Sequence, residues 1–309
     1  MDSISEVLAR NAVAAWGEAG RRFVEELPDQ RTELVQRWQL TLGAPFPMSY
    51  HWVCGARTAD GTEAVLKLGP PGSRDLAHEA ATLRHFDGRG AIRLLREAVD
   101  AGGLLLERAA PGTPASELPL ERDLFATAAI ITVMHQLHRP PAADPGLPEL
   151  LDRNTRSFVD HLARYPGDDP IPRRLVTRAL DLVRGLCESA TDRVVLHGDL
   201  HHDNVLRASG ARDEPWLAID PHGVVGDPGA EVGALLYNPD PARRDPALVA
   251  LVPERVEQLA DGLALPIDRV VAWGFVQAVL SEVWTAEVPG SPVTRALDVA
   301  LALEPRLPG

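Results

Sequence analysis

Residues 194–228 have the sequence VVLHGDLHHDNVLRASGARDEPWLAIDPHGVVGDP, and the rest of the chain is organised around this stretch. Short apolar runs predict strands, and polar loops and turns separate them. Asp199 and Asn204 follow the first run, and Asp220 follows the run at 216–219. A segment that folds back on itself would bring these three side chains together at one sheet edge. Two carboxylates and a carboxamide suit a hard cation such as Mg²⁺, with one carboxylate left as a base.

The chain before residue 108 predicts an antiparallel sheet with one helix. A helical pattern over 2–27 is punctuated by Pro28, and residues 43–49 are expected to form a loop. A further helix is expected over 74–86. The expected strands are 38–42, 50–57, 63–68, 92–99 and 104–107, with Asp60-Gly61 as a hairpin turn.

The chain after Gly112 predicts mainly helices. Residues 108–112, RAAPG, break regular structure and mark the boundary between a sheet-rich and a helix-rich part. Asp227 followed by Pro228 is a favourable helix start, with the aspartate as N-cap. The expected helices are 121–139, 149–165 and 172–189, and the tail over roughly 246–306 is also expected to be helical.

Lys67 interrupts the apolar run of residues 64–68. An isolated lysine in a strand is commonly at an edge or faces solvent. The helix at 74–86, however, places Glu79 on or beside its apolar stripe. An acid that faces a core needs a partner, and Lys67 is the nearest candidate in sequence. We therefore predict an ion pair between Lys67 and Glu79.

Composition narrows the class of protein. The 309 residues suit two lobes that share a cleft, and the net charge of −13 argues against a nucleic-acid binder. Cys54 and Cys187 lie far apart, so a disulfide framework is not expected and a reducing cytosol is the default location. The N-terminus has no signal-peptide pattern, and the apolar run at 270–280 is too short to span a membrane. A cytoplasmic protein, monomeric by default, is expected.

Two motifs of the central stretch resemble a known superfamily. HGDLHHDN at 197–204, followed by AIDPHG at 218–223, is similar to the catalytic core of aminoglycoside phosphotransferases and protein-kinase-like enzymes. IDPHGVVGDPGAEVGALLYNP at 219–239 resembles the subfamily of aminoglycoside 6-phosphotransferases and hydroxyurea kinases, as does GFVQAVLSEVW at 274–284.

The resemblance implies an α+β, bilobal protein-kinase-like fold. Its small N-lobe would be an antiparallel sheet with one helix, and its larger C-lobe would be mainly helical. The nucleotide-binding lobe would cover residues 1–108, with 1–30 as a helical extension. The catalytic and substrate-binding lobe would cover 109–309.

The resemblance also assigns roles in an ATP- and Mg²⁺-dependent phosphotransferase. Asp199 would orient the acceptor hydroxyl and take its proton, and Asn204 and Asp220 would hold Mg²⁺. Lys67, positioned by Glu79, would contact the α- and β-phosphates. Phosphoryl transfer needs positioning and charge neutralisation more than covalent chemistry. The remaining nucleotide contacts would come from the backbone of Glu107 to Ala109, on the adenine, and from the loop before Tyr50, through Ser49.

The acceptor predicted from the resemblance is a cationic aminoglycoside such as streptomycin, giving antibiotic resistance. Its guanidinium groups would suit an acidic pocket. Hydroxyurea or a neutral sugar is the alternative acceptor. The candidate acidic residues are Asp203, Asp227, Glu231 and Glu282, although for Asp227 the role of helix cap competes.

Parts of the sequence are compatible with two other classes of function. The residues His197, Asp199, His201, His202 and Asp203 are rich in metal-ligand types, which suggests a metallohydrolase. Their spacing matches no closed zinc site, and that hypothesis leaves Lys67 unexplained. A kinase-like module that binds nucleotide without catalysis is disfavoured because every expected catalytic residue is present.

Overall fold

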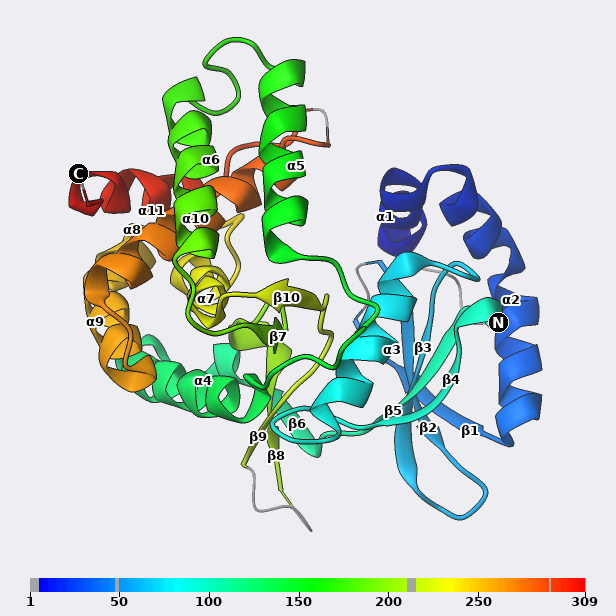
Figure 1. Ribbon diagram of the computed structural model, residues 1–309. Helices are drawn as coiled ribbons and strands as arrows, with labels where there is room; N and C mark the ends of the chain where they lie inside the picture. Colours follow the sequence, from blue (N-terminus) through cyan, green and yellow to red (C-terminus); the bar gives the residue numbers. More distant parts are fainter. Residues whose placement is uncertain (1–5, 48–49, 210–214, 289, 309) are drawn as a thin grey trace.

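The computed structural model describes residues 6–47, 50–209, 215–288 and 290–308 (Figure 1). A sheet-rich N-terminal lobe lies beside a larger helical lobe, as predicted for a protein-kinase-like fold. The N-terminal sheet is antiparallel, with strand order β1-β2-β3-β5-β4. Its strands are β1 (Thr41–Pro45), β2 (Trp52–Arg57), β3 (Glu63–Leu68), β4 (Leu94–Ala98) and β5 (Gly103–Glu107).

Side-chain alternation gives this sheet two different faces. On β3, Leu66 and Leu68 pack into a core with the N-terminal helices, whereas Lys67 between them points to the opposite face. On β5, Leu105 joins the first face and Leu104 joins the second. Because β3 is the central strand, Lys67 is not an edge residue.

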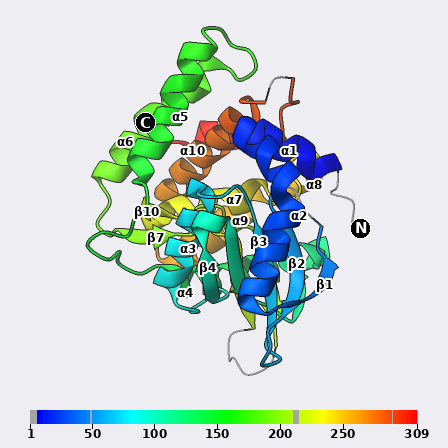
Figure 2. The same cartoon turned by 90° about the vertical axis from the view of Figure 1, so that its right-hand side faces the viewer.

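The N-terminal helices α1 (Glu6–Trp16) and α2 (Glu18–Trp38) cover the outer face of the sheet (Figure 2). The predictions of a helix end at Pro28 and of a strand from Trp38 are wrong, because α2 continues through Pro28 to Trp38. An interior proline costs about 3 kcal/mol. The helix persists because a stripe of buried side chains packs on the sheet, and because Gln30 donates hydrogen bonds to the carbonyls of Gly69, Ala101 and Gly102.

The predicted loop at 43–49 is partly wrong, because Gly43 to Pro45 belong to β1 and pair with β2. The helix α3 (Arg74–Phe86) lies on the sheet face opposite α2 (Figure 1). Its buried residues belong to a core that continues into the helical lobe. The sheet is therefore packed on both faces.

The helical lobe is built around α10 (Ile267–Thr285), which is buried on nearly every side. The other helices of this lobe are α4 (Asp123–Leu137), α5 (Leu150–Arg164), α6 (Arg173–Glu188), α7 (Val232–Tyr237), α8 (Pro246–Ala250), α9 (Val252–Leu263) and α11 (Arg295–Leu303). In the described residues no helix is both long and apolar enough to cross a membrane.

The strands of the central stretch, residues 194–228, belong to two small sheets. β7 (Val194–Leu196) pairs with β10 (Val224–Gly226), and β8 (Val205–Ala208) lies between β6 (Pro111–Pro114) and β9 (Trp216–Ala218). The sequence did not predict β6 or β10. The backbone of β9 also bonds to the N-terminal lobe, since Ala218 donates to the Gly90 carbonyl and accepts from Ile92. This contact fixes the central stretch against the first lobe.

Candidate active site

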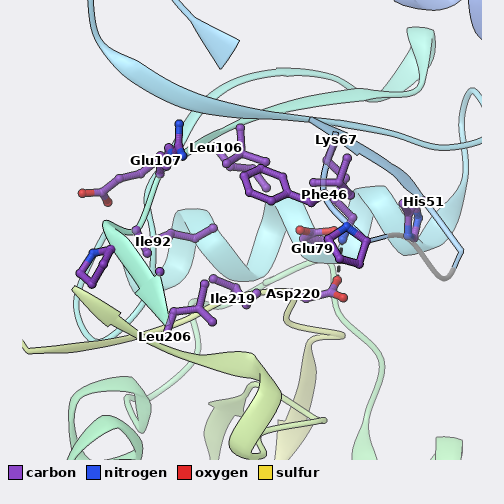
Figure 3. Close-up of a pocket in the computed structure, with 17 residues that line it drawn as sticks. Phe46, His51, Lys67, Glu79, Ile92, Leu106, Glu107, Leu206, Ile219 and Asp220 are labelled. Atoms are coloured by element: carbon purple, nitrogen blue, oxygen red, sulfur yellow. Dashed lines mark hydrogen bonds and ion pairs between the residues drawn. The ribbon is translucent and has the colours of Figure 1, made fainter. Parts of the chain in front are cut away.

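Lys67, Glu79 and Asp220 form a charged cluster in the cleft between the lobes (Figure 3). The Lys67 Nζ atom lies 2.6 Å from Glu79 Oε2 and 2.5 Å from Asp220 Oδ1. The predicted Lys67–Glu79 pair is therefore present, and Asp220 is a second partner. Lys67 and Glu79 are buried, whereas half of the Asp220 side chain is exposed to the cleft. One carboxylate thus fixes the lysine from within the protein while the other faces the solvent.

The charge on this lysine is maintained in spite of its burial. Burial lowers the pKa of Lys67, but the adjacent carboxylates of Asp220 and Glu79 outweigh it and raise the pKa above its ordinary value. The Lys67 charge, more than burial, acts on Asp220 and holds its pKa below the ordinary range. Burial raises the pKa of Glu79 to about 7, against the opposing effect of Lys67.

Asp199 lies in the loop after β7, beside two histidines. Its Oδ2 atom is 3.5 Å from His201 Nε2 and 3.9 Å from His222 Nε2. Burial by itself raises the pKa of Asp199, but the hydrogen bond and charge of His201, with smaller effects of His222 and His197, lower it to about 2. Asp199 is therefore ionised at neutral pH.

Backbone hydrogen bonds join the loop of Asp199 to the loop of Asp220. The His197 carbonyl accepts from the amides of His222 and Gly223 at 2.9 and 3.0 Å, and the His197 ring contacts the Ile219 carbonyl at 2.8 Å. The Asn204 carbonyl accepts from Ile219 at 2.9 Å. These bonds bring together the loops that carry Asp199, Asn204 and Asp220, as the sequence predicted.

Hydrogen bonds fix the orientation of the Asn204 side chain. Its Nδ2 group donates to the Asp199 carbonyl at 3.0 Å and contacts His201 Nε2 at 3.2 Å. The amide nitrogen is thereby engaged, which leaves the carboxamide oxygen as the available ligand. With the exposed carboxylate of Asp220, this oxygen gives the hard donor set that Mg²⁺ prefers. The residues present therefore fit a magnesium ion.

A cavity of about 310 Å³ extends from the charged cluster to the linker between the lobes (Figure 3). Its walls are largely apolar, with Phe46 and Val65 on the sheet side and Leu206 and Ile219 on the other. Such walls suit a flat aromatic base. Glu107 and Ala109, predicted to meet the adenine, line the far end. The remaining predicted nucleotide contact, Ser49, lies outside the described residues. We call this space the nucleotide cavity.

A second cavity of about 700 Å³ opens on the other side of the same cluster. Glu79 and Asp220 line both cavities, and His222 lines the second. Helix α1 contributes Trp16 to this second cavity, and α10 contributes Trp284. We call it the acceptor cavity.

The acceptor cavity carries charges of both signs. Its acidic side chains include Asp75, Glu149 and Asp152, and its basic side chains include Arg153 and Arg156. The sequence predicted a substrate-binding role for none of these residues or the two tryptophans. No local pattern marks them, because they come from helices α1, α3, α5 and α10, which only the tertiary fold brings together.

The acids predicted to contact substrate have different surroundings. Asp227 is buried, accepts from the Gly229 amide as a helix cap, and is bonded to Arg269 and Trp273. Glu282 is buried and accepts from the backbone amides of Thr294 and Leu297. Neither faces the acceptor cavity. Asp203 is about half exposed and lies 3.6 Å from His201.

Glu231 instead holds the catalytic loop in place. Its buried carboxylate accepts from the amides of His197 and Gly198 at 2.7 and 2.9 Å. These amides immediately precede Asp199 in the chain. Charge-assisted bonds to a buried carboxylate are strong, so Glu231 fixes the backbone that presents Asp199. Its carboxylate is thus engaged by protein donors and does not line the acceptor cavity.

Comparison with known proteins identifies the family of this chain. Residues 38–289 match the family described as aminoglycoside/hydroxyurea antibiotic resistance kinase. The chain is 36% identical to hydroxyurea phosphotransferase of Kitasatospora aureofaciens, over 88% of this chain and 76% of that protein. It is 34% identical to streptomycin 6-kinase of Streptomyces glaucescens, over 97% and 95% of the two chains.

A solved structure shares the fold. It is an aminoglycoside phosphotransferase from Streptomyces rimosus in complex with ADP and streptomycin, with a TM-score of 0.56 and 22% identity over 83% of this chain and 98% of that one. With the family match, these findings show that the chain belongs to the aminoglycoside/hydroxyurea antibiotic resistance kinases and is a phosphotransferase.

Proposed function

We propose that this kinase transfers the γ-phosphate of Mg-ATP to a hydroxyl group of a small antibiotic-type molecule and thereby inactivates it. The observation that supports this most is the position of the Lys67–Glu79–Asp220 cluster, which lies between an apolar cavity and a charged cavity. A nucleotide in the first would direct its phosphates at the cluster, and an acceptor in the second would meet them there.

Each residue of the cluster has a distinct task in this proposal. Lys67 holds the α- and β-phosphates, and Glu79 keeps the lysine in place. Asn204 and Asp220 hold Mg²⁺, which neutralises charge on the phosphates when bound. The acceptor oxygen forms its bond to the γ-phosphorus as the bond to ADP breaks, and the hydroxyl proton passes to Asp199. An ionised carboxylate with a low pKa suffices because the proton leaves late in a loose transition state.

Streptomycin or a related aminoglycoside is the first candidate acceptor. The acidic residues Asp75, Glu149 and Asp152, together with two tryptophans, suit guanidinium groups. Two relatives at 34% and 32% identity are streptomycin 6-kinases. Hydroxyurea is the second candidate, because Arg153 and Arg156 place positive charge in the same cavity and disfavour a purely cationic ligand.

The proposed lobe boundary lies between residues 108 and 109, at the end of β5. A nucleotide-binding lobe then covers 1–108, and a catalytic and substrate-binding lobe covers 109–309. The helical extension, predicted to end near residue 30, reaches Trp38 in the structure. We further propose that the enzyme acts as a monomer in the cytoplasm, where ATP is available.

An ADP-release assay over streptomycin, other aminoglycosides, hydroxyurea and simple sugars tests the proposal. We expect turnover that requires Mg²⁺ and ATP and that is selective for streptomycin or hydroxyurea. Phosphorylation of a neutral sugar with no turnover of either antibiotic would overturn the acceptor assignment. ATP binding without transfer to any compound would favour a non-catalytic module.

A further inference from the structure

Arg153 occupies an unusual position beside the catalytic loop. It lies in the first turn of α5, is half-buried, and lines the acceptor cavity. A Cβ atom added to Gly198, the residue before Asp199, would lie 3.4 Å from Arg153 Nη1. Gly198 also has φ +83°, a conformation that glycine adopts easily. The guanidinium of Arg153 therefore lies directly beside the residue that precedes the base.

The guanidinium of Arg153 lacks the partners that other buried arginines have. Arg255 pairs with Asp123, Arg269 pairs with Asp227, and Arg295 donates to several carbonyls. Within the described residues, Arg153 forms no ion pair, and its side chain has a single weak bond, from Nε to Asn154 Oδ1 at 3.3 Å. Its two Nη groups are thus available as donors.

The side chain is nevertheless held in place. Its Cζ atom stands 5.4 Å from the centroid of the Trp284 ring, a cation–π distance. The Trp284 Nε1 group donates to Ser157 Oγ at 3.2 Å, and Ser157 in turn donates to the Arg153 carbonyl at 3.2 Å. Burial lowers the pKa of Arg153, while the nearby charges of Glu231 and Asp199 oppose this. A charged, pre-oriented donor therefore faces the acceptor cavity.

We propose that Arg153 determines acceptor specificity by donating hydrogen bonds to a second oxygen, carried by the atom adjacent to the one that bears the phosphorylated hydroxyl. This inference rests on the proposed function. A guanidinium has five donors and no acceptor, so it recognises oxygen and rejects ammonium groups. The acceptors it selects carry two neighbouring oxygens, with Asp199 taking the proton of one and Arg153 binding the other.

This requirement accounts for two unlike compounds. The streptidine ring of streptomycin has a hydroxyl adjacent to the 6-hydroxyl, and hydroxyurea has a carbonyl oxygen close to its N-hydroxyl. The compounds share little else in size or charge. One arginine would therefore serve both acceptors, and the acidic residues Glu149 and Asp152 would add affinity for the cationic one.

The test compares Arg153→Gln with wild type on matched acceptor pairs. One pair is streptomycin and its 5-deoxy derivative, and the other is hydroxyurea and N-methylhydroxylamine, which lacks the carbonyl. We expect R153Q to lower kcat/KM for the complete acceptor about 10- to 100-fold, as for loss of a charged hydrogen bond. For the acceptor without the second oxygen the loss should be under about 3-fold. The KM for ATP and the Tm should stay unchanged.

Two further variants separate specificity from a general effect. Arg164→Gln removes a charge from the last turn of the same helix, outside the acceptor cavity, and should alter kcat/KM less than about 3-fold. Arg153→Lys keeps the charge and should restore only part of the activity, because a lysine cannot present the planar donor fork. An equal loss on both members of each pair, or a raised KM for ATP, would overturn the inference. If wild type phosphorylates none of these compounds, the proposed function itself fails, and the inference falls with it.

Discussion

The nucleotide cavity and the acceptor cavity adjoin the same charged cluster, yet different kinds of side chain line them. The nucleotide cavity has apolar walls, and its charges are concentrated at Lys67 and its two carboxylates. The acceptor cavity is larger, with acids, arginines and tryptophans mixed along its walls.

The difference reflects what each cavity is proposed to bind. A nucleotide presents a flat base and a row of phosphates, so apolar walls and a few charged side chains on strands and one helix suffice. Acceptors differ among relatives, and the walls that would meet them come from helices of both lobes, including α1. Four experiments test whether the two cavities are functionally separate, and they follow from the largest expected effect to the smallest.

Asp199→Asn should lower kcat more than any other single change, by about 10²- to 10⁴-fold, because it removes the proton acceptor. In this proposal Asp199 takes part in phosphoryl transfer and does not bind either ligand. The KM values for ATP and for the acceptor, measured by steady-state ADP release, should therefore change little. The control is Asp203→Asn, which removes a neighbouring exposed carboxylate and should be near wild type. Retained phosphoryl transfer in D199N would contradict the assignment of the base.

Lys67→Met should act on the nucleotide side alone. Loss of a charged contact to the phosphates should raise the KM for ATP about 10- to 100-fold, with the acceptor KM unaffected. Arg108→Gln removes a more exposed cation from the same cavity and serves as the matched control. A parallel rise in the acceptor KM would show that the two cavities are not separate. Thermal unfolding checks that the buried Glu79 has not destabilised the lobe.

Trp16→Ala should act on the acceptor side alone. Loss of an aromatic wall should raise the acceptor KM about 2- to 10-fold and leave the KM for ATP unchanged. Phe46→Ala, on the wall of the nucleotide cavity, should give the reverse pattern. If both variants changed the same KM, the division between cavities would not hold.

The pH dependence of stability gives the smallest effect. Asp199 has a pKa of about 2 in the folded protein against an ordinary 3.8, so its ionised form stabilises the fold. That contribution is present above about pH 4 and is lost as the pH falls toward 2. As the pH falls from 5 to 3, the Tm of wild type should therefore decrease relative to the Tm of D199N. A constant difference would argue against a depressed pKa.

Sequence patterns predicted the nucleotide side better than the acceptor side. Lys67 and Glu79 lie on a strand and a helix that are adjacent in the chain, and each breaks an apolar pattern, so their pairing is a local inference. Asp199 and Asp220 follow short apolar runs within one stretch, and their loops do meet. Arg153 carries no such signal, because its significance depends on Gly198 and Trp284, which are distant in sequence.

The structure differs from the sequence expectations for physical causes of the same kind. Asp227 and Glu231 were candidates for an acidic substrate pocket, with a helix cap as the alternative for Asp227, and both carboxylates are buried and satisfied by protein donors. Proline at position 28 suggested a helix end, and packing against the sheet overrode it. Local rules gave way in each case to tertiary burial.

The N-terminal helices have a consequence for how this enzyme can be trimmed or recombined. The match to the family begins at residue 38, where α2 ends. A recombinant fragment cut at that point would uncover Leu66, Leu68 and Leu105 on the outer face of the sheet, an apolar patch prone to aggregation. It would also lose Trp16 from the acceptor cavity. When N-terminal lobes are exchanged between relatives to make chimaeras, each lobe should therefore keep its own helices α1 and α2.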